Sequence, residues 1–450
     1  MSSDHEMIMP GHEVDEVELP DVATARVYEH GWQSWSPTAC YPAAATSARP
    51  AHAWQLSMRF RPEVPAPQEG FQAEGLLVVD PGQDEPVRVY SAQTPTARVP
   101  SIRARLTRRT LQVTANGPVR VDRVPGTMNQ ALARLGKRLG DTMGVALRPA
   151  PTVWCSWYHY FLEVTESDIV ENLEAIEAHD LPVDVVQVDD GWEAGIGDWL
   201  ALSDRFSSTE ALATRIREGG RRAGIWLAPF IAGADSSLAR EHPDWLLGDA
   251  GHNWDQPLLG LDLTHPGVQA HLHHVFTGLR AQGYDYFKLD FLYGGALLGP
   301  RHEPCTGEEA YRAGLQVIRD AVGPDGYLLG CGAPMLPSIG IVDAMRVSSD
   351  TYDPTDSANG QDVLRGRANI EARAWQQGRL WVNDSDSLVA RPQFDRREAW
   401  ASVIEAYGGL RSVSDRVGDL DDWGLETTRR VLSSAPPPVP FASLPELCDG

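Results

Sequence analysis

The segment 185–192 has the sequence VVQVDDGW, and it carries the pattern that decides the fold. Three valines and a glutamine are followed at once by two aspartates, a glycine and a tryptophan. A short apolar run of this kind is typical of a strand buried on both faces, as in a parallel sheet. The polar residues behind it should then lie at the carboxyl end of that strand.

The same pattern recurs from about residue 150 onward, where short β-like segments alternate with longer amphipathic ones. This alternation favours a parallel sheet with crossover helices. The eight strands that we expect are Val153–Trp157, Val185–Asp189, Gly224–Phe230, Tyr286–Phe291, Tyr327–Cys331, Ala344–Ser348, Leu380–Asp384 and Glu405–Val413. Eight alternations over roughly 280 residues match a (β/α)8 TIM barrel. A doubly wound sheet is the alternative, but no G-x-G-x-x-G or P-loop motif follows any of these strands.

Local signals place some of the helices. Thr165 with Asp168 predicts an N-cap in front of a helix over Ile169–Ala178. Gly219–Gly220 predicts the end of the next helix.

Residues 1–140 differ in character, because short β-like runs are separated there by Pro and Gly and helical periodicity is almost absent. Ala73–Val79, Val87–Tyr90 and Leu111–Ala115 are such runs, and they predict an N-terminal antiparallel β-sandwich domain. The basic run Arg103–Thr110 is interpreted as the solvated face of a strand. We expect the catalytic barrel over residues 141–432 and a Pro-rich C-terminal tail over 433–450.

The composition of the chain limits the classes of partner that it can bind. A formal net charge of −23 over 450 residues argues against nucleic acid, because the phosphate backbone would repel the protein. The first residues lack an apolar signal-peptide core, and no apolar stretch is long enough to span a membrane. The scattered cysteines predict reduced thiols and a cytoplasmic protein; they are Cys40, Cys155, Cys305, Cys331 and Cys448. Self-association into a homo-oligomer is left open.

Chemically capable side chains follow strand after strand of the expected barrel, whose carboxyl ends form the active-site face. They are Trp154, Trp157, Tyr158, Asp189, Asp190, Trp192, Trp226, Lys288, Asp290, Cys331, Arg346, Asp350, Asn383, Asp384 and Asp386. Aromatic rings beside carboxylates suit a neutral, hydroxyl-rich ligand, because sugar C–H faces stack on rings while carboxylates accept hydrogen bonds from hydroxyl groups. This set therefore predicts a sugar site.

Two carboxylates stand out by strand parity. Lys288 and Asp290 point to the same side of their strand, and an ammonium beside a carboxylate favours the ionised form that a nucleophile needs. A structural ion pair inside the barrel is the alternative interpretation. Arg346, Ser348 and Asp350 share a face in the same way, so Asp350 is available as the second carboxylate that glycoside hydrolysis requires.

A metal site finds little support. His271, His273 and His274 lie on an expected helix outside the barrel, where histidines are usually surface or core residues. Residues 353–362 fail the spacing of an EF-hand loop. We therefore expect no metal at these residues.

The ordered set of motifs resembles the α-galactosidases of glycoside hydrolase family 36, among the melibiase-like enzymes of clan D. The matching segments, in the order of the family and over most of the chain, are Gly31–Trp35, Trp154–Trp157, Asp189–Trp192, Gly224–Pro229, Lys288–Asp290, Cys331–Gly332, Arg346–Asp350 and Asn383–Asp386. The short N-terminal region and the absence of a C-terminal β domain are similar to the compact microbial and archaeal members. These two departures leave aglycone specificity and assembly open.

The resemblance implies a retaining exo-α-galactosidase that works by double displacement without cofactor or metal. It implies that Asp290 is the nucleophile and Asp350 the general acid/base, and that Asp189 and Asp190 hold the galactose O4 and O6 hydroxyls. The implied sugar-contacting residues are Trp192, Trp226, Lys288, Cys331 and Arg346, with Trp157 and Tyr158 at the pocket mouth. A raffinose-synthase type galactosyltransferase, an α-N-acetylgalactosaminidase and a non-catalytic sugar-binding barrel are the alternatives.

Overall fold

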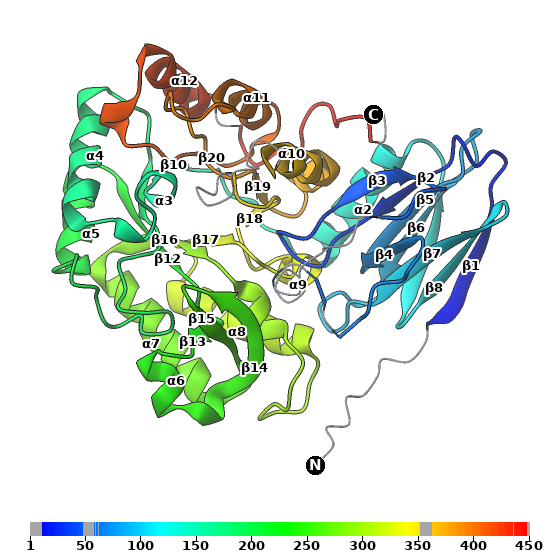
Figure 1. The fold of residues 1–450 in the computed structure, drawn as a ribbon, viewed down its shortest axis with the longest axis horizontal. Coiled ribbons are helices and arrows are strands. Elements are labelled where there is room, and N and C mark those ends of the chain that lie inside the picture. Colours follow the sequence, from blue (N-terminus) through cyan, green and yellow to red (C-terminus); the bar gives the residue numbers. More distant parts are fainter. Residues whose placement is uncertain are drawn as a thin grey trace.

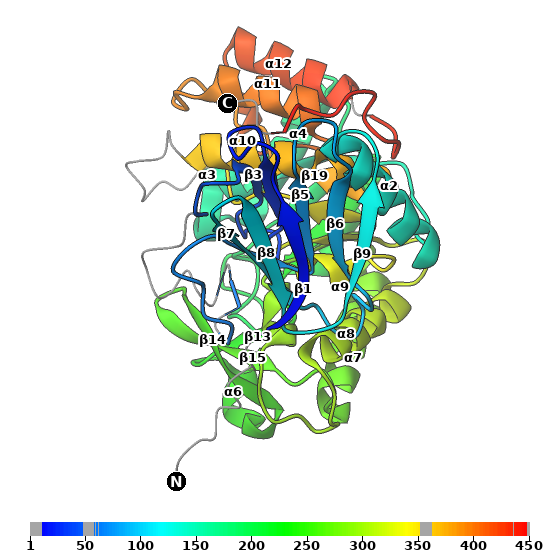
Figure 2. The same ribbon diagram turned by 90° about the vertical axis from the view of Figure 1, so that its right-hand side faces the viewer.

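The computed structural model describes residues 11–47, 58, 60–61, 63–351, 362–434 and 436–447, with the backbone alone for 362–365. Its β-rich N-terminal part, blue in Figure 1, lies beside a larger part in which helices surround a central sheet. Figure 2 turns the N-terminal part toward the viewer, with the rest of the molecule behind it.

The N-terminal part consists of two antiparallel sheets, one of five strands in the order β3-β2-β5-β6-β9 and one of four in the order β1-β8-β7-β4. The strands are β1 His12–Glu18, β2 Arg26–Glu29, β3 Ala39–Pro42, β4 Phe71–Glu74, β5 Leu76–Asp80, β6 Val87–Ala92, β7 Ser101–Thr107, β8 Thr110–Ala115 and β9 Val119–Val124. Alternating residues such as Phe71, Leu77 and Leu111 form one core between the sheets. The predicted β-sandwich is thereby confirmed.

Two details of that prediction were wrong. Ala73–Val79 is not one strand, because Gly75 at φ +74° breaks it and sends β4 and β5 into different sheets. The basic run Arg103–Thr110 is not one strand either, since β7 ends at Thr107 and a turn follows with Arg108 at φ +62°.

A helix that the sequence analysis missed, α2 (Met128–Thr142), follows β9 and spans residue 140, where we expected the domain boundary. Thr127 accepts a hydrogen bond from the Gln130 N–H, and the Gln130 side chain accepts one from Thr127 in return. This reciprocal pair is a capping box and fixes the start of the helix. The buried face, with Leu132 and Leu135, joins the main core.

The second part is the predicted (β/α)8 barrel. Its parallel strands run in the order β19-β18-β17-β16-β12-β11-β10-β20, and a bridge between Asp384 and Leu410 joins the two ends. The strands are β10 Thr152–Cys155, β11 Val185–Val188, β12 Arg222–Leu227, β16 Tyr284–Leu289, β17 Tyr327–Gly330, β18 Ala344–Arg346, β19 Val382–Asp384 and β20 Arg411–Val413. The expected eighth strand, Glu405–Val413, was too long: its first three residues end a helix, and the chain turns at Gly408–Gly409 before β20.

The helices of this part alternate with the barrel strands or lie in the segments inserted between them. They are α3 Trp157–Tyr160, α4 Glu166–Ala178, α5 Thr209–Glu218, α6 Ser237–Glu241, α7 Pro266–Gln282, α8 Gly307–Val322, α9 Met335–Ser338, α10 Asp362–Arg373, α11 Arg397–Tyr407 and α12 Asp422–Ser433. The predicted helix ends are confirmed. Thr165 caps α4 in a capping box with Asp168, and Gly219 ends α5.

Two further segments decorate the barrel. A small antiparallel sheet of β13 (Ile231–Gly233), β14 (Leu246–Asn253) and β15 (Gln256–Leu261) is inserted between β12 and α7. Residues 436–447 have no helix or strand, yet Leu444 and Leu447 pack against the main core. Among the described helices, none has the length and apolar character needed to cross a bilayer.

The barrel interior is layered, and this places the site. Val153, Val185, Tyr286, Tyr327 and Val382 form a compact inner cluster. Because side chains alternate along a strand, the residues two positions further on also face inward. They are Cys155, Gln187, Lys288, Leu329 and Asp384, and Asp189, Asp290 and Cys331 follow directly behind β11, β16 and β17. Each strand thus leads from an apolar floor to a chemically capable end.

The loop between β2 and β3 carries Trp32–Trp35 from the sandwich onto this face of the barrel. Ser34 donates from its N–H to the Ala333 carbonyl over 3.1 Å, and the Met335 N–H donates to the Trp32 carbonyl over 3.0 Å. Gly332, at φ +53°, allows the approach, since a Cβ there would meet the Trp35 ring at 2.9 Å. The sandwich therefore contributes directly to the surroundings of the active-site face.

The cysteines depart from expectation at one position. Cys155, Cys305 and Cys331 are free, but Cys40 is disulfide-bonded. The prediction of reduced thiols is therefore wrong for Cys40, while the predicted state of Cys448 concerns a residue outside the described ones.

Candidate active site

Asp189 lies at the end of β11 in a network of donors. Lys288 Nζ donates to its Oδ2 over 3.0 Å, the Asp190 N–H donates to its Oδ1 over 3.0 Å, and Gln187 and Cys155 also donate to Oδ2. Burial by itself would lower the pKa of Lys288, but the adjacent Asp189 carboxylate raises that pKa well above its ordinary value. Lys288 is thus a fixed ammonium, and its hydrogen bond goes to Asp189.

Asp290 lies directly behind β16 and is buried. Trp226 Nε1 donates to its Oδ2 over 3.0 Å, and the Phe291 N–H donates to its Oδ1 over 2.9 Å. Phe291 adopts φ +50°, a conformation that non-glycine residues rarely take and that persists where the surrounding structure imposes it. Two N–H groups therefore hold the carboxylate that the sequence predicts as nucleophile.

Asp350 lies four residues beyond Arg346, the last residue of β18, so it belongs to the following loop. Arg346 Nη1 donates to its Oδ1 over 3.0 Å, and 51% of the Asp350 side chain is exposed. It faces an opening, but the surrounding protein still removes part of its hydration. This desolvation, together with the negative Asp386 and Asp290, outweighs Arg346 and raises the pKa of Asp350 to about 6.

Arg346 itself is buried and lies between three carboxylates. Its Nε donates to Asp384 Oδ2 over 3.0 Å, and its Nη2 lies 2.7 Å from Asp386 Oδ1. Burial would lower the pKa of Arg346, but Asp386 and Asp384 raise it well above its ordinary value. The guanidinium is therefore a permanent cation that ties Asp350 to the end of β19.

Asp190 is buried, and burial together with the neighbouring Glu193 carboxylate raises its pKa well above the ordinary value. Trp254 Nε1 donates to Asp190 Oδ2 over 2.8 Å, and this contact opposes the rise. Glu193 accepts from the Gly191 N–H over 3.3 Å, and burial raises the pKa of its carboxyl group as well. Two neighbouring buried carboxyl groups therefore both have a raised pKa at the end of β11.

The other predicted residues surround these groups at different depths. Trp192 is fully buried behind Trp226 and donates from Nε1 to the Trp226 carbonyl over 2.9 Å. Cys331 is buried, and this burial raises the pKa of its thiol well above the ordinary value. Trp157 is half-buried on α3. Tyr158 is buried, with its hydroxyl on Asp386.

Sequence reasoning missed two groups at this face. Trp254 is the turn residue of the β14–β15 hairpin, at φ +49°, and its ring lies 4.9 Å from Phe291. An insertion between strands 3 and 4 carries no barrel periodicity, so the sequence offered no signal for it. Glu193 directly follows the DDGW motif, and its position one residue after that motif was the available signal.

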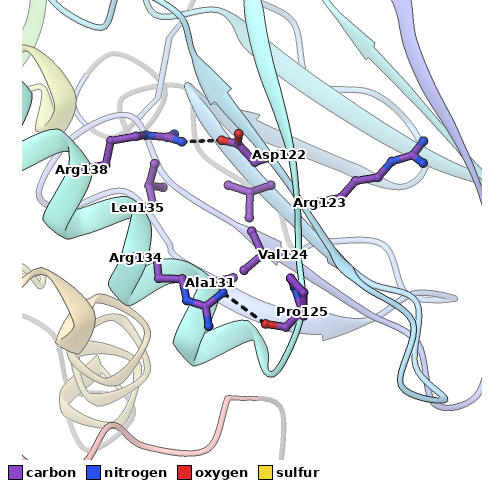
Figure 3. Close-up of a pocket in the computed structure, with 9 residues that line it drawn as sticks. Asp122, Arg123, Val124, Pro125, Ala131, Arg134, Leu135 and Arg138 are labelled. Carbon is purple, nitrogen blue, oxygen red and sulfur yellow. Dashed lines mark hydrogen bonds and ion pairs between the residues drawn. The ribbon is translucent and has the colours of Figure 1, made fainter.

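A cavity of about 290 Å³ lies elsewhere, between α2 and the strands β6 and β9. Figure 3 shows its residues: Arg138 pairs with Asp122, Arg134 points to the Pro125 carbonyl, and Arg123 points away. None of the predicted site residues lines it. Over the described ranges, no group of three or more His, Cys, Asp or Glu could hold a metal ion.

Comparisons with known proteins agree with this geometry. The Melibiase family model matches residues 134–306. A probable α-galactosidase C of Aspergillus flavus is 30% identical over 187 residues, which cover 37% of this chain and 25% of the fungal protein. The matched region thus spans a quarter of that curated relative.

Solved structures match over much more of the chain. TtGalA, an α-galactosidase from Thermus thermophilus solved with p-nitrophenyl α-D-galactopyranoside, is 27% identical, with a TM-score of 0.77 over 93% of this chain and 88% of that one. The family 36 α-galactosidase AgaA from Geobacillus stearothermophilus, at 15% identity and a TM-score of 0.60, shares the fold. Residues 134–306 therefore match the Melibiase family model, and the chain is similar to the α-galactosidase TtGalA over most of its length.

Proposed function

We propose that this protein is a retaining exo-α-galactosidase that removes terminal α-D-galactosyl residues. The observation that carries the proposal is the pair of carboxylates behind β16 and β18, on either side of β17, in contrasting surroundings. Two N–H groups hold Asp290, while desolvation keeps a proton on Asp350 up to a pH of about 6. A nucleophile and a general acid need this contrast.

In the proposed reaction Asp290 attacks C1 of the galactosyl unit while Asp350 gives its proton to the departing glycosidic oxygen. The C1–oxygen bond breaks as the C1–carboxylate bond forms, which gives a covalent β-galactosyl-enzyme. Asp350, now ionised, takes a proton from water, whose oxygen attacks C1 and releases Asp290 and α-galactose. The atoms and charges balance without metal or cofactor.

Preference for galactose is proposed to come from Asp189 and Asp190. Both carboxyl groups are buried and held by protein donors, so only a sugar with the axial O4 hydroxyl would add its hydrogen bonds to theirs. TtGalA is also solved with stachyose, and α-galactoside oligosaccharides are accordingly the proposed substrates. A non-catalytic sugar-binding role would leave the proton on Asp350 without purpose.

A panel of p-nitrophenyl α- and β-glycosides tests this function. We expect turnover of the α-galactoside at least roughly 100-fold above that of the α-glucoside, because the hydrogen bonds at O4 are made by one epimer only. Turnover of the α-N-acetylgalactosaminide instead would reassign the substrate. Transfer of galactose to sucrose in place of hydrolysis would favour the galactosyltransferase, and no turnover of any glycoside would contradict an enzymatic role.

The pH dependence gives an independent prediction. Asp350 must carry its proton in the first step, and its pKa is raised to about 6, so kcat/KM for raffinose should fall as the pH rises through about 6. The protonated form is fully present below that value and is lost above it. In Asp350→Asn the residual kcat/KM for raffinose should no longer fall as the pH rises through about 6. If kcat/KM of the variant still falls at the same pH, the fall belongs to the titration of a group other than Asp350.

Two broader features are also proposals. The division into an N-terminal unit up to about residue 140, a barrel and a tail from residue 433 follows the change from β-sandwich to barrel elements. A cytoplasmic location is the second, and it is supported by the free thiols of Cys155, Cys305 and Cys331.

A further inference from the structure

Asp386 is a buried carboxylate just beyond β19 to which the mechanism gives no task. Its backbone has φ +79°, a left-handed conformation that non-glycine residues rarely adopt and that persists where the surrounding structure imposes it.

The contacts of Asp386 converge from three segments. Oδ1 accepts from the Ser387 N–H over 2.7 Å and lies 2.7 Å from Arg346 Nη2. Oδ2 accepts from the Thr351 N–H over 2.7 Å, from Thr351 Oγ1 over 2.9 Å and from the Tyr158 hydroxyl. Five donors therefore fix one carboxylate, and only one of them comes from its own turn.

Two of these partners lead directly to Asp350. Thr351 is the next residue, so its N–H bond to Asp386 holds the peptide unit that joins Asp350 to Thr351. Arg346 forms an ion pair with Asp386 through Nη2 and donates a hydrogen bond to Asp350 through Nη1. The direction of the Asp350 side chain is thus set both through the main chain and through the guanidinium.

We propose that Asp386 is the positioning residue of the general acid/base: it holds Asp350 through Thr351 and Arg346 and touches no reacting atom itself. The inference rests on the proposed function, since it assigns a partner to the acid/base of that reaction. It also explains why Tyr158 is buried, because its hydroxyl supports Asp386.

The charge of Asp386 matters as well as its shape. The charged groups acting on Asp350 are Arg346 from β18, Lys288 and Asp290 from β16, and Asp386 itself, while the neutral Tyr158 approaches from α3. Asparagine at position 386 keeps the shape but removes one negative charge. The substitution also removes a carboxylate that competes with Asp350 for the Arg346 cation. Both changes stabilise the ionised form of Asp350, so a smaller fraction of Asp350 carries the proton that the acid must donate.

The test compares Asp386→Asn with wild type on two substrates. Nitrophenolate leaves without a proton, whereas the sugar leaving group of raffinose needs one, and kcat/KM reports the step in which it leaves. We expect kcat/KM for raffinose to fall on the order of 100-fold and that for p-nitrophenyl α-galactoside less than about 5-fold. The pH at which kcat/KM for raffinose begins to fall should be lower in Asp386→Asn than in wild type.

Two further variants control the interpretation. Asp415 is another buried carboxylate, located beyond β20, with an arginine partner, Arg391. Asp415→Asn should lower kcat/KM for both substrates by the same factor or leave both values unchanged. Thr351→Val removes one donor to Asp386 and should lower kcat/KM for raffinose by about 5-fold with little change on the nitrophenyl substrate. This variant decides the question if Asp386→Asn does not fold.

The positioning role would be overturned if both Asp386→Asn and Thr351→Val lost the same factor in kcat/KM on the two substrates and kept the pH dependence of the wild type on raffinose. Asp386 would then have a structural role only. A wild-type protein that cleaves neither galactoside would instead contradict the proposed function. The two failures are therefore distinguishable.

Discussion

Replacing Asp290 by alanine is expected to lower kcat for p-nitrophenyl α-galactoside by about 10⁴-fold or more, the scale seen when a covalent nucleophile is removed. The reason lies in the geometry, because Trp226 and the Phe291 N–H hold this carboxylate at the end of β16 and no step of the proposed double displacement proceeds without it. Initial rates under saturating substrate measure the effect.

Azide sharpens this test. In Asp290→Ala a small anion can take the place of the carboxylate and attack C1 while nitrophenolate leaves, so β-galactosyl azide is the expected product. Asp325→Asn is the matched control, since Asp325 is an exposed carboxylate that precedes β17, at the opposite end of the barrel. Near wild-type turnover of raffinose by Asp290→Ala, or an azide of α configuration, would be incompatible with Asp290 as nucleophile.

Arg373→Met is expected to lower the free energy of unfolding by about 3–5 kcal/mol, the range for a buried polar group whose partners lose their hydrogen bonds. Arg373 is completely buried at the end of α10, where it donates to the main-chain carbonyls of Gln33, Ser34, Ser36 and Val347. Methionine fills most of the volume but removes the donor that these four buried carbonyls share. Burial lowers the pKa of Arg373 to about 10, so the group stays charged at neutral pH.

The shift of the urea midpoint at constant slope measures this loss. Arg367→Met is the control, because Arg367 lies on the same helix, is largely exposed and pairs with Glu371 at the surface. Its effect should stay within about 0.5 kcal/mol. If both variants unfold at the same urea concentration, the Arg373 contacts contribute little to the attachment of the sandwich loop.

The barrel could be predicted because its strands are short apolar runs with polar ends, and strand parity then aligned Lys288 with Asp290. The last strand could not be placed, since Arg411–Val413 is only three residues long and the apolar residues just before it, such as Ile404, belong to the buried face of α11. Helix α2 was missed although Thr127 and Gln130 form a capping box, because the surrounding β-like runs outweighed that signal.

At the site, the residues found from sequence are those attached to barrel strands, such as Asp290 and Arg346. Asp350 was predicted from its position relative to Arg346, but its raised pKa depends first on desolvation and then on Asp386 and Asp290, which follow other strands. Trp254 and Trp35 arrive from an inserted hairpin and from the sandwich, and long-range placement of this kind leaves no trace in local periodicity.

The loop that carries Trp35 onto the barrel has a consequence for how this protein can vary. Trp35 packs edge-on against Phe291 at 5.1 Å, and Phe291 is the residue after Asp290. Both the sandwich and the barrel thus contribute residues next to the proposed nucleophile. A change in size at Trp35 therefore requires a compensating change at Phe291, and the reverse also holds. Exchange of sandwich segments between related proteins would act on the reacting carboxylate as directly as a change in the barrel, although more than 250 residues of chain separate the two.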